Sequence, residues 1–229
     1  MRSLTVISCV CLIGYLAPGA HGETLKDVVT RIDQAADAFR GMTAKLKKAS
    51  YTAVIKDLTE ESGAIAMRLG KGREMEVRVD FSQPDAKTWA FRGRRAELFL
   101  PKINTVQEYD LGKHGRLLDQ FLLLGFGSTS KDLEKSYTLK LAGEEALAGK
   151  KTSKLELIPK SNEARQHLSK VEIWFPSDSG YPVQQKFYQG SGDYVLVSYS
   201  EAKLDSAIPD TAVRLALPKG VKREYPQKQ

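Results

Sequence analysis

Short runs in which apolar and polar residues alternate are the feature that most constrains the fold of this chain. Apolar side chains occupy every second position from Ile65 to Leu69, and again from Met75 to Phe81. Successive residues of a strand point to opposite faces of a sheet, so each run predicts a strand with one apolar face. Gly70-Lys71-Gly72 supplies the turn between the two runs. The pattern therefore predicts an antiparallel sheet with one face turned toward a core or a cavity.

Similar runs extend this prediction over most of the chain. Glycine-containing turns, such as Asp178-Ser179-Gly180, separate them. Further strands are predicted at residues 89–93, 98–100, 106–111, 137–141, 153–157, 171–175, 183–188, 194–199 and 212–217.

Three segments break the period of two and predict helices. Residues 23–48 place apolar side chains at three- and four-residue steps, which predicts an amphipathic N-terminal helix. Residues 115–124 are dense in leucine and end at a glycine, which predicts a short helical insert. Residues 131–135 predict another short helix, capped by Ser130. The insert either plugs the end of a barrel or forms a lid over an apolar cavity.

These elements predict a mainly β (α+β) fold. We expect an unclosed antiparallel β-barrel, or curled sheet, with an N-terminal helix and a short helical insert that forms a lid. The chain shows neither a 20–50-residue repeat nor a low-complexity linker. We therefore expect residues 23–229 to form a single domain.

Residues 1–22 have the pattern of a cleaved secretory signal peptide. Arg2 gives a positive start, residues 4–16 form an apolar run, and Ala20-His21-Gly22 offers small residues before Glu23. The run is shorter than the ~20 apolar residues that span a bilayer. Both cysteines, Cys9 and Cys11, lie within this segment. We expect a periplasmic protein without disulfides.

The composition is basic, with a net charge of +7. Lysine-rich strands in contact with solvent would produce such a charge, as would a surface that attracts an anionic membrane or lipid headgroup. We expect no nucleic-acid partner, because an exported protein rarely meets one. The Arg92-Gly93-Arg94-Arg95 cluster is interpreted as a charged hairpin tip.

The residues that catalysis would require do not form a recognisable pattern. Beyond residue 22 the histidines are His114 and His167, and neither has a partner at metal-ligand spacing. A Gly-x-Ser-x-Gly elbow does not occur. The Gly125-Phe126-Gly127-Ser128 segment lacks the Lys-Ser/Thr ending of a phosphate loop. We expect no enzyme activity, no cofactor and no metal site.

The apolar side chains of the strands and the insert are the candidates for ligand binding. They would either line a cavity or fill a dry core, and composition does not separate these alternatives. In a cavity, an acyl chain gains ~0.8 kcal/mol for each CH2 group that it buries. The candidate residues are Met67, Leu69, Met75, Val77, Val79, Phe81, Trp89, Phe91, Phe99, Phe121, Leu122 and Phe126.

Three motifs in this order resemble the outer-membrane lipoprotein carrier family, the LolA-type lipoprotein-sorting proteins. The first is Phe81-Ser82-Gln83-Pro84-Asp85, with the hairpin that follows it through Leu111. The second is Leu157-Ile158-Pro159-Lys160, one strand before residues 171–175. The third is Leu215-Ala216-Leu217-Pro218-Lys219-Gly220-Val221. The order of signal, helix, hairpins, insert and closing strands also matches, so the resemblance covers the chain from residue 23 onward.

The resemblance implies a β-barrel that does not close, covered by a helical lid over a cavity for acyl chains. It also implies that cargo comes from an inner-membrane transporter and passes to an outer-membrane acceptor. Arg73 falls where the family has the arginine that holds the lid closed. Glu74 replaces the proline that usually follows it, and Val79 replaces the family's tryptophan.

Two further functions stay open beside the carrier. One is a lipid-binding or lipid-sensing envelope protein whose cargo is not a lipoprotein. The other is a structural or interaction protein with a closed apolar core. For the carrier we expect an acylated lipoprotein or lipid as cargo, transient contact with a membrane, and a monomer.

Overall fold

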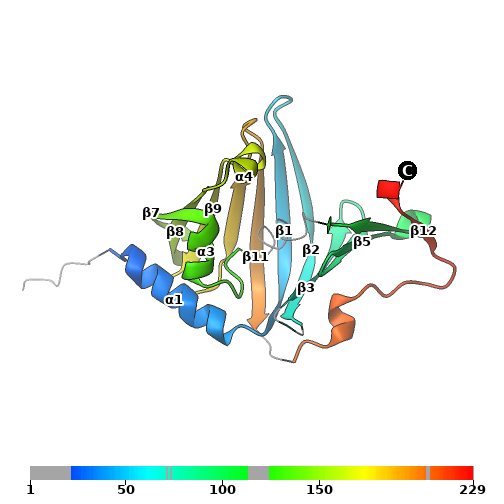
Figure 1. Ribbon diagram of the computed structural model, residues 1–229, viewed down its shortest axis with the longest axis horizontal. Coiled ribbons are helices and arrows are strands. Elements are labelled where there is room, and N and C mark those ends of the chain that lie inside the picture. Colours follow the sequence, from blue (N-terminus) through cyan, green and yellow to red (C-terminus); the bar gives the residue numbers. More distant parts are fainter. Residues whose placement is uncertain (1–21, 71, 73, 113–123, 205–206, 229) are drawn as a thin grey trace, which may run out of the picture.

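A computed structural model describes residues 22–70, 72, 74–112, 124–204 and 207–228. Within these residues, twelve strands form one unclosed sheet, in the order β12-β6-β5-β4-β3-β2-β1-β11-β10-β9-β8-β7 (Figure 1). Every neighbouring pair is antiparallel except β12 and β6, which run parallel. The predicted curled sheet with an N-terminal helix is thus confirmed, with one parallel pair added. Residues 1–21 of the signal segment, residues 115–123 of the predicted helical lid with its Phe121 and Leu122, and Arg73 lie outside the described residues.

The strands have the following bounds. They are β1 (Gly41–Thr52), β2 (Asp57–Leu69), β3 (Met75–Gln83), β4 (Lys87–Arg92), β5 (Arg95–Leu100), β6 (Thr105–Asp110), β7 (Tyr137–Leu147), β8 (Lys150–Pro159), β9 (Lys170–Pro176), β10 (Gln184–Tyr188), β11 (Tyr194–Leu204) and β12 (Lys222–Glu224). The helices are α1 (Leu25–Ala38), α3 (Ser130–Ser136) and α4 (Asn162–His167), with one-turn 3₁₀ helices at Pro101–Ile103, Asp210–Val213 and Pro226–Lys228.

The N-terminal helix is shorter than the sequence predicts. Thr24 caps α1 in a reciprocal capping box with Asp27, and the helix ends at Ala38 because Phe39 has an extended backbone. The predicted helical continuation to residue 48 is wrong. Residues 41–52 form β1, in which Met42, Ala44 and Leu46 are buried at every second position. Residues spaced by four, such as Met42 and Leu46, fit both periods, which explains the error.

One face of the sheet, called the inner face here, carries the core in two clusters. The first lies where α1 and α3 cover β7 to β9, and Val28 of the helix packs there against Leu155 and Ile173 of the strands. The second lies on β1 to β3 beside the start of β1, where Phe39 and Phe126 close over Met67 and Val77. The inner face of the sheet is therefore covered over β7 to β9 by the first cluster and over β1 to β3 by the second.

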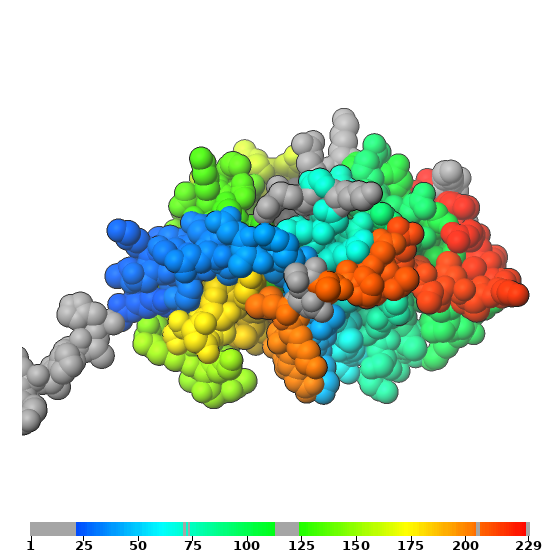
Figure 2. All heavy atoms as spheres, turned by 90° about the horizontal axis from the view of Figure 1, so that it is seen from below, coloured from blue at the N-terminus to red at the C-terminus, as the bar shows by residue number. Residues whose placement is uncertain are grey.

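The outer face of the sheet is crossed by the chain that follows β11. Glu76 is buried there, accepts a hydrogen bond from Arg68 at 2.7 Å and forms an ion pair with Arg92 at 2.9 Å. Arg68 reaches on to Asp210, at 2.5 Å, and so holds the crossing segment. Figure 2 shows this segment (orange to red) and α1 (blue) covering different parts of the lower side of the molecule.

The predicted strand at residues 212–217 is wrong. A 3₁₀ turn, Asp210–Val213, is followed by irregular extended chain. Pro209 and Pro218 flank this stretch and have no N–H to give to a sheet. Its backbone is instead bonded by a side chain, since Arg78 donates to the carbonyl of Arg214 at 3.1 Å.

The other predicted strands are confirmed, and the short helix after residue 130 is confirmed as α3. Its cap is Thr129 rather than Ser130, again through a capping box, here with Asp132. In the part of the chain that the structure describes, the helices lack the length and apolar character that crossing a membrane would require.

Candidate functional site

An apolar cavity of about 370 Å³ opens on the inner face of the sheet, between the two core clusters. One wall comes from β1 to β4 and the other from β10 and β11, with the end of α4 at the rim. Its volume lies within the range of small-molecule sites in proteins, about 300–1,000 Å³. The residues that line it are Leu46, Lys48, Ile65, Val79, Phe81, Trp89, Phe91, His167, Leu168, Gln185, Phe187, Gln189, Val195, Val197 and Tyr199.

Aromatic side chains form the wall on β4. Trp89 and Phe91 are two residues apart on one strand, so both point to the inner face. Their rings are stacked, with centroids 5.6 Å apart and planes inclined by 8°. Val79 of β3 pairs with Trp89 and continues this wall. The result is a flat apolar surface that can contact a long hydrocarbon chain along its length.

Gln185 is a buried polar residue in the floor of the cavity. Its amide nitrogen donates to the carbonyl of Leu124, and its oxygen accepts from the hydroxyl of Tyr199 at 2.8 Å. Burial raises the pKa of Tyr199 above its ordinary value of 10.0, which keeps the hydroxyl protonated as a donor. The Gln185 amide and the Tyr199 hydroxyl of the floor are thus hydrogen-bonded within the protein, and most of the remaining surface of the cavity is apolar.

A charged cluster lies beside the cavity on the same face. Glu61 accepts from Lys48 at 2.9 Å and from Lys87 at 2.5 Å. Both amines also lie over the ring of Phe81, at 5.9 and 5.3 Å from its centroid. Burial raises the pKa of Glu61, but the hydrogen bonds from the two lysines outweigh it and leave the pKa lowered. The cavity edge therefore holds two cations and one carboxylate over an aromatic ring.

The structure brings some of the candidate ligand-binding residues together and separates others. Val79, Phe81, Trp89 and Phe91 line the cavity. The candidates that belong to the second core cluster instead are Met67, Met75, Val77 and Phe126, with Leu69 packed against them.

Phe99 lies on the other face of the sheet. Its neighbour Leu98 pairs with Trp89 and so shares the inner face, whereas Phe99 pairs with Thr88 and Val106. The three remaining candidates, Arg73, Phe121 and Leu122, fall outside the described residues.

The second wall of the cavity was missed by sequence reasoning. Phe187, Val195 and Val197 were predicted to lie on strands but were not assigned to a site. Alternation from Val195 to Tyr199 marks one apolar face, and this signal could have identified them. Their position opposite Trp89 depends on the pairing of β1 with β11, which no local pattern reveals.

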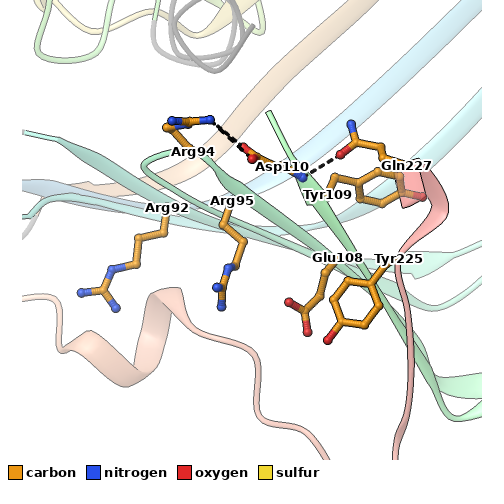
Figure 3. A pocket seen from close by; sticks show the side chains of 8 residues that line it. All are labelled: Arg92, Arg94, Arg95, Glu108, Tyr109, Asp110, Tyr225 and Gln227. Carbon is orange, nitrogen blue, oxygen red and sulfur yellow. Dashed lines mark hydrogen bonds and ion pairs between the residues drawn. The ribbon is translucent and has the colours of Figure 1, made fainter. Parts of the chain in front are cut away.

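A second, polar cavity of about 530 Å³ lies at the tip of the β4–β5 hairpin (Figure 3). Carboxylates hold two of its arginines: Arg92 bonds Glu76 at 2.9 Å, and Arg94 lies 3.4 Å from Asp110. A carboxylate, Glu108, also lines it. The other lining residues are Arg95, Tyr109, Tyr225 and Gln227. The interpretation of residues 92–95 as a charged hairpin tip agrees with this arrangement.

Among the described residues, no group of three His, Cys, Asp or Glu side chains could hold a metal ion. The lining of the larger cavity carries charges of both signs, whereas the smaller cavity is mostly apolar. The apolar cavity is therefore the candidate site for a lipid.

Comparisons with known proteins find similar structures but no match by sequence. Neither a protein-family model nor a curated protein sequence matches the chain. An uncharacterised conserved protein from Thermus thermophilus is similar with a TM-score of 0.53 and 14% identity, over 87% of this chain and 98% of that protein. MucB is similar with a TM-score of 0.52 and 15% identity, over 83% of this chain. At these identities the comparisons establish a shared fold.

The chain spans 62% of the length of MucB. The similar structures also include a LolA superfamily protein, NE2245 from Nitrosomonas europaea. It is 14% identical, with a TM-score of 0.41, over 84% of this chain and 98% of that protein. The fold comparison rests on the first two structures.

Proposed function

We propose that this protein is a periplasmic carrier that binds the acyl chains of lipoproteins in the apolar cavity and moves them toward the outer membrane. The observation that carries this proposal is the cavity itself, with aromatic and aliphatic walls and a satisfied floor. An acyl chain gains ~0.8 kcal/mol for every buried CH2 group, so a cavity of this kind binds a chain without any polar recognition. The protein acts in this proposal by binding and release, without catalysis.

The charged cluster at the edge suits the polar end of such a cargo. Acyl chains of lipoproteins join the protein through ester and amide groups, whose carbonyl oxygens accept hydrogen bonds. Lys48 lines the cavity, and Lys87 bonds the same carboxylate as Lys48. Amines in these positions can donate to the linkage while the chain lies against Trp89. The same site would also hold another lipid, so the experiment must identify the bound molecule chemically.

Transfer partners belong to the proposal as well. A carrier must receive its cargo from one membrane protein and give it to another, and we propose an inner-membrane transporter and an outer-membrane acceptor in these roles. A ligand shifts a conformational equilibrium only by its difference in affinity for the two states. Cargo release therefore requires an acceptor whose affinity for the acyl chains exceeds that of the cavity.

The first experiment is native mass spectrometry of the protein purified from the periplasm, followed by extraction of whatever is bound. An acylated peptide supports the lipoprotein carrier, and a free lipid supports a related carrier with another cargo. A bare mass together with no binding of a fluorescent acyl probe would overturn both and leave a dry core.

A variant locates the site. Val197→Trp places an indole in the cavity and should weaken acyl-probe binding by roughly tenfold or more, since it displaces buried CH2 groups. Ile103→Trp is the matched control, because Ile103 is exposed and away from the cavity. Equal probe binding by a folded Val197→Trp protein would exclude the cavity as the site.

Depletion of the protein should also mislocalise lipoproteins in cell fractions.

A further inference from the structure

We propose that the tip of the β1–β2 hairpin docks into an anionic membrane surface and brings the mouth of the cavity to the lipid. This docking site deepens the proposed carrier function and takes its biological meaning from it. The hairpin projects beyond the neighbouring strands, at the end of the sheet where α4 lies (Figure 1). Its two strands remain paired out to Thr52 and Asp57.

Large apolar side chains at this tip face water. Val54 is 87% exposed and Ile55 is 69% exposed, and Leu58 on the returning strand is 49% exposed. Aliphatic side chains gain free energy when they leave water, in proportion to the apolar area that they bury. Lys56 lies beside them in the turn. Asp57 follows Lys56, and a further cation, Lys186, lies below the tip over the ring of Tyr194. A projecting apolar tip above lysines suits the boundary between acyl chains and anionic headgroups.

A row of tyrosines crosses the outer face below the tip. Tyr51 pairs with Leu58 on one side and with Tyr194 on the other, and Tyr194 pairs in turn with Tyr188. The rings of Tyr51 and Tyr194 stack at 5.1 Å. Lys186 holds its amine 3.9 Å from the centre of the Tyr194 ring and 4.7 Å from that of Tyr188. Tyrosine and lysine side chains with apolar bodies and polar ends are enriched at membrane–water interfaces.

The spacing between tip and row fits such an interface. Tyr51 is followed by one more strand residue, Thr52, and then by the turn of residues 53–56, so the tip lies less than the roughly 10 Å of three extended residues beyond the row. Peripheral elements bury their apolar face about 5–10 Å into the headgroup and acyl boundary. With Val54 and Ile55 among the acyl chains, the tyrosine row lies at the level of the headgroups.

The tip is held in place before any membrane is met. The N–H of Ala53 donates to the carboxylate of Asp193 at 2.7 Å, and the N–H of Lys56 donates to the carbonyl of Ala53 at 3.3 Å. The first bond ties the hairpin to the turn between β10 and β11. Because the tip is already ordered, docking requires little loss of conformational entropy.

The same turn leads into the cavity. Val195 follows Tyr194, pairs with Ser50 and lines the cavity, as does Gln189 at the other end of the turn. Strand residues next to each other point to opposite faces, so the tyrosine row and the cavity wall are the two sides of one strand end. Docking the tip therefore sets the cavity edge beside the bilayer, where an acyl chain could pass without crossing bulk water.

The test is flotation of the secreted protein with vesicles of an equimolar mixture of phosphatidylcholine and phosphatidylglycerol. The wild type should float with these vesicles, and less with vesicles of phosphatidylcholine alone, because cations contribute to the binding. Replacement of both tip residues, Val54→Ser with Ile55→Ser, should lower the partition coefficient roughly tenfold. The control replaces two exposed apolar residues elsewhere, Ile103→Ser with Leu204→Ser, and should float like the wild type.

A tryptophan reporter makes the insertion visible. On adding the mixed vesicles, Val54→Trp should show a blue shift of emission, and quenching by brominated lipid, beyond those of the wild type, in which Trp89 and Trp174 alone emit. Equal flotation of the tip variant and the wild type would overturn the docking site. So would the finding that the tip residues only cause the protein to associate with a second copy of itself in solution. Loss of docking with normal acyl-probe binding leaves the carrier proposal intact, whereas normal docking without probe binding overturns the carrier alone.

Discussion

The hydroxyl of Tyr199 donates to the side-chain oxygen of Gln185 across two paired strands, at 2.8 Å. The amide nitrogen of Gln185 donates in turn to the carbonyl of Leu124. This bond attaches the segment before Phe126, which is part of the second core cluster, to the sheet. The polar groups of the cavity floor are thus hydrogen-bonded to one another, while most of the side chains around the cavity are apolar.

Replacement of Gln185 by leucine should destabilise the protein by about 1–3 kcal/mol, because the Leu124 carbonyl and the Tyr199 hydroxyl lose a buried partner. Urea unfolding measures this loss as a lower midpoint concentration of urea at an unchanged m-value. Tyr199→Phe removes one bond and should cost less, about 0.5–1.5 kcal/mol. If the double variant loses the full sum of both, the two side chains do not act as one connected unit.

Gly63 occupies a position that no side chain can share. A Cβ there would lie 1.9 Å from the backbone oxygen of Asp80, at the bulge where β2 changes register with β3. Gly63→Ala should therefore destabilise the protein by ~3 kcal/mol or more, since β2 and β3 must separate. Gly190→Ala is the control, with open space around its Cβ and an expected change within about 0.5 kcal/mol. Near-equal stability of the two variants would contradict the packing described for this bulge.

Glu61 should make part of the stability depend on acidic pH. Its folded pKa is lowered below the ordinary value of 4.5, because the bonds from Lys87 and Lys48 outweigh the opposing effect of burial. The stabilisation is present above 4.5 and is lost as the pH falls through the folded pKa. Urea unfolding at neutral pH and below 4.5 should show a smaller acid loss for Glu61→Gln than for the wild type. Glu60→Gln, on an exposed pair with Lys47, should leave the acid loss unchanged.

Glu76 should hold the chain that crosses the outer face. Glu76→Leu leaves Arg68 without its buried carboxylate and weakens the arrangement that extends to Asp210. Limited proteolysis should then cut residues 207–221 faster, by severalfold, while the cavity still binds an acyl probe. Asp85→Ala removes a solvent-exposed ion pair with Lys102 and should leave cleavage at wild-type rates. Unchanged cleavage in Glu76→Leu would show that other contacts hold the segment.

Much of the sheet was predictable from alternation alone. From Ile65 to Phe81 the period of two identifies the strands and their apolar face, and Trp89 and Phe91 follow the same rule. Phe99 shows where the rule stops, because Leu98, Phe99 and Leu100 are all apolar and give no sign of which face each takes. The face of Phe99 is set by the register with β4, a tertiary property.

The other wall of the site depends on contacts between distant parts of the chain. Leu46 pairs with Tyr199, more than 150 residues later, and this pairing closes the cavity. Local patterns in β1 are weak, since alanine, serine and lysine fill much of it and backbone hydrogen bonds carry the pairing. The amphipathic period was therefore assigned to a helix, and the two walls of the cavity were not connected.

The parallel strand β12 gives the sheet two unlike ends. β7 presents eleven residues of backbone along one end of the sheet, whereas Thr105 to Gln107 of β6 are occupied by the chain's own last strand. A second molecule that brought its β7 to β6 would first have to displace β12. Edge-to-edge addition at that end would otherwise have only the three residues of β12 to pair with, and very short edge strands are one way in which proteins disfavour such addition.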